Sequence, residues 1–205
     1  MVKIAGPTAR WIVLCVFIVL CAFPFAWATF TIFKTNPDLY TSGHVPFLYT
    51  QKPTFENVTV LFGQTDYLVF VRNTVIVGVI VVVLTLLGSV PAAYAIARLT
   101  GSWGSKVGIA IFIVYLVPPT LLFLPMARVV AVLGLTDSIW SLVVVYPTLT
   151  MPLSTWLLIG FFRGVPRDIE EQATVDGYSR FGAFWRTVLP LAMPGMLTVA
   201  VFSFA

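Results

Sequence analysis

The densest polar stretch of the chain is EEQATVDGYSRFGAFWRTVLP, residues 170–190, where side chains capable of ionic contact gather. Its carboxylates include Glu170, Glu171 and Asp176, and Arg180 and Arg186 follow them. This density is unusual in a chain of 205 residues that is 59% hydrophobic and 10% charged. Opposite charges at such a density suit complementary contact with a partner in water. The stretch therefore predicts a binding surface.

Other kinds of chemical site are missing from the sequence. His44 is the only histidine, so imidazole ligands cannot build a metal site. Cys15 and Cys21 lie six residues apart in one apolar run, as small core or lipid-facing residues do. GSWGSK, from Gly101, lacks the spacing of the phosphate-binding pattern G-x-x-x-x-G-K-[ST]. We expect no metal site, no cofactor and no catalytic residue.

The elements that position the polar stretch are membrane spans. The mean hydropathy is +0.98, and soluble domains carry charge on about a quarter of their residues. At ~1.5 Å per helical residue, five apolar runs reach roughly 27 to 38 Å, against a hydrocarbon core of about 30 Å. Lipid offers backbone groups no other partners, so each run is predicted to be helical. The runs are Trp11–Phe33, Asn73–Ala97, Val107–Ala127, Ile139–Phe162 and Val188–Ala205.

The distribution of Lys and Arg predicts the orientation. The N-terminus, the turn after the second span and the polar loop (residues 163–187) carry eight of the twelve basic residues. Because loops rich in Lys and Arg stay in the cytoplasm, the N-terminus and the polar loop are predicted to be cytoplasmic. These eight residues are Lys3, Arg10, Arg98, Lys106, Arg163, Arg167, Arg180 and Arg186.

The segment between the first two spans is predicted to lie outside. Within it, PTFENVTVLFG, from Pro53, is expected to form a short interfacial helix, since Phe55, Val58 and Phe62 recur at helical spacing. Asn57-Val58-Thr59 matches the glycosylation pattern, but so short a pattern recurs by chance.

Prolines and the placement of acids narrow the function. Pro118, Pro119 and Pro125 fall within the third span, where each removes a backbone donor, so we expect a broken helix that lines a cavity near mid-membrane.

All eight acidic residues lie in loops, whereas ion-driven carriers keep a carboxylate within the membrane. Energy for any uphill transport would come from another subunit. Polar or aromatic residues able to reach a cavity are Ser89, Tyr94, Tyr115, Tyr146, Thr150 and Ser154.

The polar loop is predicted to fold as a helix, a sharp turn and a second helix. Pro166 suits the first helical position, residues 167–175 give about two turns, and Gly177 supplies the left-handed residue that ends the helix. Ser179 is placed to cap the second helix. That helix carries an apolar face available to a partner, made of Phe181, Phe184, Trp185 and Val188.

The loop resembles a known signature. E-Q-A-T-V-D-G, nine residues, then T-V-L-P is similar to the cytoplasmic EAA motif of membrane subunits of ATP-binding-cassette importers: E-A-A, three residues, G, nine residues, I, any residue, L-P. Gln172 and Thr187 depart from it: Gln172 is polar where the family has a small residue, and Thr187 replaces a branched apolar residue. The agreeing anchors are Glu171, Ala173, Gly177, Leu189 and Pro190.

The resemblance extends beyond the loop. Residues 133–166 look like the fourth span of carbohydrate permeases of the maltose-importer G-subunit type, and RNTVIVG, from Arg72, and PAAYAIARL, from Pro91, resemble the second span. It implies that residues 1–205 form a type I importer transmembrane domain in a bacterial or archaeal plasma (inner) membrane. Such domains have six spans, so we expect a truncated chain that stops within the fifth.

The resemblance also implies partners and roles. The partners are a second permease, an ATPase dimer, an extracytoplasmic solute-binding protein, membrane lipid and a sugar, with no nucleic acid; ATP is hydrolysed in the separate ATPase. Glu171, Ala173, Asp176 and Gly177 would dock a coupling helix onto the ATPase, and Leu189 and Pro190 complete the signature. The proline cluster supplies the candidate translocation path, which consists of Tyr115, Pro118, Pro119 and Thr120.

Two alternatives stay open: another polar solute such as a polyamine, or a non-transporting anchor for a cytosolic partner.

Overall fold

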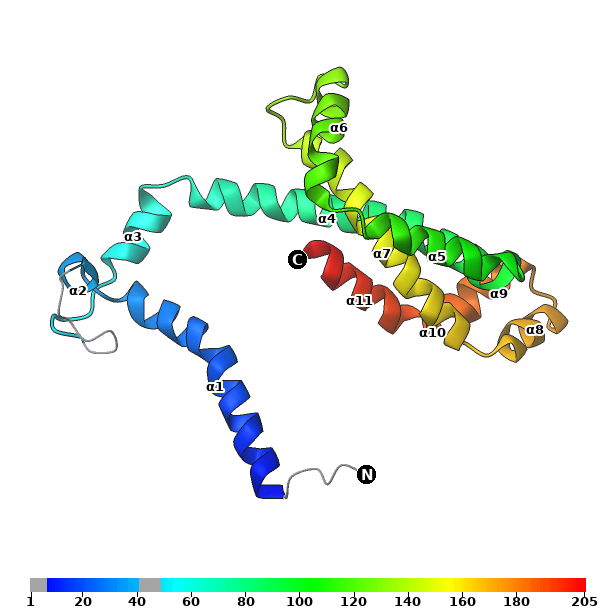
Figure 1. Cartoon of the computed structure of the whole chain (residues 1–205), viewed down its shortest axis with the longest axis horizontal. Coiled ribbons are helices and arrows are strands. Elements are labelled where there is room, and N and C mark those ends of the chain that lie inside the picture. The colour runs from blue at the N-terminus through cyan, green and yellow to red at the C-terminus, as the bar shows by residue number, and fades with distance from the viewer. Residues whose placement is uncertain (1–6, 41–48) are drawn as a thin grey trace. The chain divides into compact units, whose positions relative to one another are not determined.

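A computed structural model describes residues 7–40 and 49–205 of the chain, so His44 lies outside the described residues. The described residues fold as helices joined by turns and loops (Figure 1). The chain divides into two compact units, residues 1–70 and residues 71–205. The all-α membrane fold predicted from the sequence is confirmed.

Unit 1 consists of one long apolar helix and the polar segment that follows it. The helices are α1 (Pro7–Ile32), α2 (Asn36–Tyr40) and α3 (Glu56–Gly63). Asp38 accepts hydrogen bonds from the backbone N–H groups of Thr50 and Gln51 at 3.2 and 3.1 Å. The side-chain amide of Asn57 donates to the carbonyls of Ile32 and Lys34 at 2.9 and 2.7 Å. The short helix predicted after Pro53 is present as α3.

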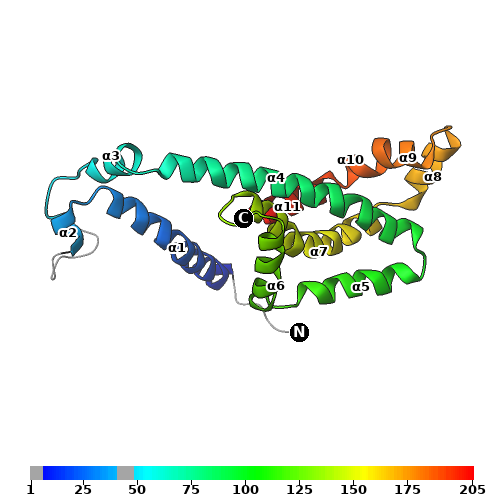
Figure 2. The ribbon, with the colours of Figure 1, turned by 90° about the horizontal axis from the view of Figure 1, so that it is seen from above.

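Unit 2 holds the remaining spans. α4 (Tyr67–Tyr94), which begins at the boundary of the units, continues into the π-helix η1 (Ala95–Leu99). α5 (Trp103–Tyr115), α6 (Pro119–Val132) and α7 (Trp140–Gly164) follow. α5 lies along α7, as two perpendicular views show (Figures 1 and 2). The first, second and fourth predicted spans are confirmed as helices long and apolar enough to cross a membrane.

The third and fifth apolar runs are each broken. α5 and α6 meet at 86° across residues 116–118, as the proline cluster predicted, although Pro125 stays inside α6. The fifth run was expected to be one helix from Val188, and that is wrong. The helical stretch Arg180–Leu191, which ends in α10 (Leu189–Leu191), meets α11 (Met193–Phe204) at 70° across Ala192. Pro194 accounts for the new start because its missing N–H suits a first helical turn. Counting each bent pair as one span, the described residues hold up to five.

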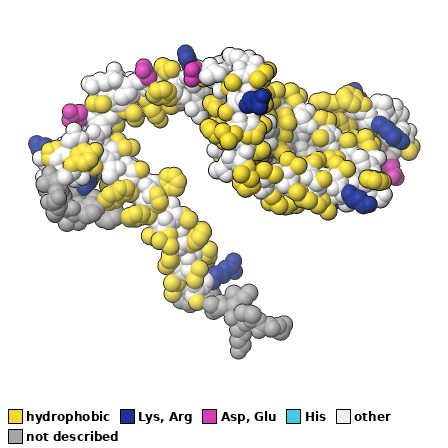
Figure 3. Space-filling model, turned by 45° about the horizontal axis from the view of Figure 1, so that its top comes forward, with side chains coloured by type: hydrophobic (Ala, Val, Ile, Leu, Met, Phe, Trp, Pro, Cys, Tyr) yellow, Lys and Arg dark blue, Asp and Glu magenta, His cyan; other side chains and the backbone are white. Residues whose placement is uncertain are grey.

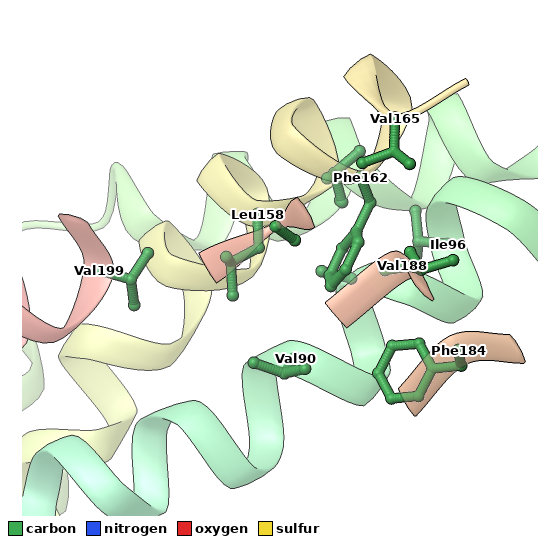
Figure 4. Packing of buried hydrophobic residues seen from close by; sticks show 11 residues of the cluster. Val90, Ile96, Leu158, Phe162, Val165, Phe184, Val188 and Val199 are labelled. Carbon is green, nitrogen blue, oxygen red and sulfur yellow. The ribbon is translucent and has the colours of Figure 1, made fainter. Parts of the chain in front are cut away.

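A buried apolar cluster joins the helices of unit 2. Side chains from α4, η1, α7, η2 (Phe184–Val188) and α11 converge in it (Figure 4). Leu158, Phe162, Val188 and Val199 are fully buried there. Lipid is as apolar as leucine, so burial alone drives little association between spans, and close packing holds such helices together.

Hydroxyl groups form a second seam between α4, α7 and α11, the hydroxyl seam. Thr85 and Thr150 share a hydrogen bond of 2.6 Å, and Ser89 donates to the carbonyl of Met151 at 3.3 Å. The hydroxyls of Ser154 and Ser203 lie 3.4 Å apart. These bonds connect three helices that are distant in sequence, so the seam fixes their register with neutral groups.

Candidate functional site

The first helix of the polar loop is α8 (Arg167–Val175), with the predicted bounds. Pro166 is the N-cap residue, with φ −57° and ψ 136°. It therefore lies one residue before the first helical position, which the sequence had predicted for it. The extended ψ follows from its place outside the helix. Asp168 and Glu170 occupy the first turn, where carboxylates interact favourably with the helix dipole.

The sharp turn lies at Gly177, as predicted. Its φ is +91°, in the region that favours glycine. The N–H of Tyr178 donates to the carbonyl of Ala173 at 3.0 Å, and the N–H of Gly177 donates to that of Thr174 at 3.1 Å. This pair of bonds is the Schellman arrangement, which satisfies carbonyls at the end of α8 and fixes the direction of the chain beyond it.

The second helix is α9 (Arg180–Ala183), which runs directly into η2. The Ser179 hydroxyl accepts a hydrogen bond from the N–H of Gly182 at 3.2 Å, which confirms the predicted cap. Half of the expected apolar face is turned inward, because Phe184 and Val188 belong to the buried cluster. Phe181 and Trp185 remain 70% and 53% exposed. These two side chains are therefore the aromatic part of this helical face that is open to a partner.

The predicted docking residues differ in their surroundings. Glu171, Asp176 and Gly177 are exposed on α8 and at its end, whereas Ala173 is 4% exposed. Its small side chain faces the chain's own interior, where α8 packs against α9 and η2. In unit 2, many of the basic side chains visible in Figure 3 gather at the end where α8 and α9 lie. The loop thus presents exposed carboxylates on a basic background.

Sequence reasoning missed an inward-facing cluster made of Tyr94, Arg98 and Glu170, which we name the latch. The Tyr94 hydroxyl donates a hydrogen bond to a carboxylate oxygen of Glu170. The Arg98 guanidinium lies 3.6 Å from the other oxygen, measured from Nε to Oε2. Its Nη2 also donates to the carbonyl of Val165 at 2.5 Å. These contacts join α4, η1, the end of α7 and α8.

An aromatic group supports the latch from within the buried cluster. The ring of Tyr94 lies 4.4 Å from that of Phe184 and 5.9 Å from that of Phe162, between centroids. Such tilted and edge-on pairs add to the energy of packing. The same tyrosine therefore packs its ring against α7 and η2 while its hydroxyl holds α8.

The signature residues open the last span. Leu189 and Pro190 are the first residues of α10. Leu189 packs against the buried cluster, and Pro190 is exposed.

The candidate path residues lie together at the break between α5 and α6. Tyr115 ends α5, Pro118 caps α6, and Pro119 and Thr120 begin it; all four are exposed. Four other residues predicted to reach a cavity make contacts within the chain instead. Ser89 and Ser154 are buried in the hydroxyl seam, Thr150 shares a hydrogen bond with Thr85, and Tyr94 donates a hydrogen bond to Glu170. Tyr146 is 42% exposed on α7.

Comparison with known proteins assigns the family. Residues 86–205 match the family described as the binding-protein-dependent transport system inner membrane component. The sulfoquinovosyl glycerol transport system permease protein of Agrobacterium fabrum is 32% identical over 200 residues, which cover 98% of this chain and 70% of that protein. The trehalose/maltose transport system permease protein of Thermococcus litoralis is 29% identical, over 91% of this chain and 66% of its own length.

A solved structure has the same fold. It is a bacterial ABC transporter involved in the import of the acidic polysaccharide alginate, and its matching chain superposes with a TM-score of 0.77 at 21% identity. The match covers 96% of this chain and 68% of that one. The sequence matches and the shared fold agree with the spacing of the signature from Glu171 to Pro190. The chain belongs to the family of binding-protein-dependent transport system inner membrane components.

Proposed function

We propose that this chain is a permease subunit of an ATP-driven importer, which moves a carbohydrate across the plasma membrane and draws its energy from a separate ATPase. The observation that carries the proposal is the helix-turn-helix of the polar loop, whose turn is hydrogen-bonded at Gly177 and which exposes Glu171 on α8. A short rigid element seated in a cleft of a partner transmits the partner's movement to the spans. Family membership supports the same reading.

In this function residues 163–187 lie in the cytoplasm, as does the N-terminus, and dock onto the ATPase dimer. Glu171 pairs with a basic group of the ATPase, Asp176 and Gly177 hold the end of α8 in position, and Phe181 and Trp185 add apolar contact. The small side chain of Ala173 lets α8 pack closely against α9 and η2. ATP binding and hydrolysis take place in the partner, so this subunit needs no catalytic residue.

The translocation path runs past the broken third span. Residues 116–118 interrupt the helix between α5 and α6. Pro118 and Pro119 have no N–H to offer the carbonyls four residues earlier, and the carbonyl of Val114 accepts from the N–H of Val117 instead. Such backbone is tolerated at membrane depth only where protein buries it or water reaches it. We assign Tyr115, Pro118, Pro119 and Thr120 to the wall of the path, which a second permease subunit completes.

The class of cargo follows from the relatives. Their names give sulfoquinovosyl glycerol, trehalose or maltose, and alginate, all carbohydrates or carbohydrate derivatives. A solute-binding protein outside the membrane would deliver the sugar. A polyamine or another polar solute is the alternative cargo, and a plain anchor is the alternative function. The broken third span favours transport, because an anchor gains nothing from an interrupted helix.

The test is uptake by the assembled importer in proteoliposomes, with its ATPase inside and its binding protein outside. Radiolabelled disaccharides, an oligosaccharide and a polyamine are offered with ATP or with a non-hydrolysable analogue. We expect ATP-dependent accumulation of a carbohydrate. Accumulation of the polyamine alone would overturn the cargo class. No accumulation of any solute, despite a stable complex with the ATPase, would support the anchor.

A further inference from the structure

Glu170 and Glu171 adjoin in the sequence, yet their surroundings are opposite. The Glu171 side chain is exposed, whereas that of Glu170 is 19% exposed and contacts Tyr94 and Arg98. Adjacent residues in a helix point about 100° apart, so one carboxylate can face a partner while the next faces the spans. α8 thus carries one carboxylate that is exposed and one that contacts the spans.

Arg98 is the centre of the inward contact. Its side chain is 6% exposed, and a buried charge is costly unless it is paired and hydrogen-bonded. The carboxylate of Glu170 supplies the opposite charge, and the carbonyl of Val165 accepts a hydrogen bond. Val165 is the C-cap residue of α7, immediately before Pro166 and α8. The guanidinium therefore holds both ends of the short connection between α7 and α8.

We propose that Glu170 is a positioning residue: with Tyr94 and Arg98 it fastens α8 to the end of α4, so that movement imposed on α8 reaches α4. The inference rests on the proposed docking of an ATPase onto the polar loop. Without this contact, only its packing against α9 and η2 would hold α8, and a push on Glu171 would turn α8 about the extended backbone at Pro166. With it, the force passes to η1 and α4, whose hydroxyl seam with α7 then carries it into the membrane.

The first experiment measures coupling in the assembled importer. Glu170→Gln keeps an oxygen that accepts from Tyr94 but removes the charge that faces Arg98. We expect the ATPase to co-purify as in the wild type, while solute moved per ATP hydrolysed falls about fivefold or more, the lower end of coupling between sites. Asp168→Asn is the matched control, because it removes an exposed carboxylate from the same helix. An unchanged ratio of solute to ATP in Glu170→Gln would overturn the proposal.

The second experiment needs no transport. Leu99 and Val175 line one cleft beside the latch and are 60% and 87% exposed. Leu99→Cys and Val175→Cys are combined after Cys15 and Cys21 are replaced by alanine, and a short bifunctional maleimide joins the two thiols in membranes. We expect Glu170→Gln to slow the cross-linking severalfold, and Asp168→Asn to leave it unchanged. Equal rates in all three backgrounds would overturn the latch.

The two experiments separate the two proposals. If the wild-type importer shows no ATP-dependent uptake but cross-linking depends on Glu170, the proposed function fails and the attachment of α8 to α4 stands. If uptake is normal and cross-linking is indifferent to Glu170, the function stands and the latch fails. Tyr94→Phe adds a graded case, because it removes one hydrogen bond and keeps the ion pair between Glu170 and Arg98, so its effect should lie between wild type and Glu170→Gln.

Discussion

A Cβ at position 104 would lie 2.3 Å from the carbonyl oxygen of Ile96, so Gly104 is a point of close approach between α5 and η1. The same Cβ would lie 2.5 Å from the Thr100 hydroxyl. A backbone carbonyl cannot move aside as the end of a side chain can. We expect Gly104→Ala to destabilise the protein by about 1 to 3 kcal/mol, the usual cost of overpacking.

The measurement for Gly104→Ala is unfolding in detergent, followed by circular dichroism. Gly160→Ala serves as the control, since a Cβ there would meet nothing within 4 Å. Equal stability of the two variants would show that the backbone of η1 can shift away from the added methyl group with little loss of stability.

The hydrogen bond between Thr85 and Thr150 predicts a measurable coupling between α4 and α7. Thr→Val keeps the shape of the side chain and removes the hydroxyl. A double-mutant cycle of Thr85→Val and Thr150→Val should give a coupling of about 0.6 to 1.7 kcal/mol, as interhelical bonds in membranes do. The same detergent unfolding supplies the four stabilities. Additive single effects would mean that the two hydroxyls do not depend on each other.

Glu171→Lys should leave the protein in the membrane and weaken its hold on the ATPase. Reversing a charge that is buried on docking costs about 2 to 5 kcal/mol. The assay is co-purification of the ATPase from detergent-solubilised membranes. Glu56→Lys, which reverses an exposed charge on α3 in unit 1, should retain the ATPase. Retention by Glu171→Lys as well would place the ionic contact elsewhere on the loop.

Gly177 should resist substitution for a reason of backbone conformation alone. Its φ is +91°, and a Cβ there would meet nothing within 4 Å, so clashes with other residues play no part. Gly177→Val should cost about 1 to 3 kcal/mol and misdirect α8 and α9. Gly177→Asn is the matched comparison, since asparagine tolerates the left-handed region better. We expect uptake to fall in the order Gly, Asn, Val at position 177. Equal uptake by all three would show that a side chain at this position causes no backbone strain.

Thr120→Cys should react with a small hydrophilic thiol reagent, because the start of α6 is assigned to the path. Cys15 and Cys21, both exposed, must first be replaced. The reaction rate in the active importer should change when ATP is supplied. Ser89→Cys, at a buried position of the hydroxyl seam, should stay unreactive. If cysteines across residues 115–123 all fail to react, this span is packed against lipid or protein and the break is only a kink.

The parts predicted well were those fixed by neighbouring residues. The left-handed turn at Gly177, the cap at Ser179 and the break after Tyr115 each follow from one local backbone requirement. The latch could not be predicted in this way, because Tyr94 and Glu170 are 76 residues apart in the chain. The sequence also gives no sign of which of the two adjacent carboxylates, Glu170 or Glu171, faces inward. The second bend, at Ala192, was missed because an apolar run shows its length more plainly than its interruptions.

The hydroxyl seam has an electrical consequence. An elementary charge that crosses a potential of 100 mV exchanges about 2.3 kcal/mol with the field. The seam joins α4, α7 and α11 through Thr and Ser hydroxyls and one carbonyl, all without formal charge. Sliding or tilting of these helices along the seam therefore moves no net charge from its groups through the membrane. Dissipating the membrane voltage at constant ATP should therefore leave the seam's own contribution to the energy of this movement unaltered.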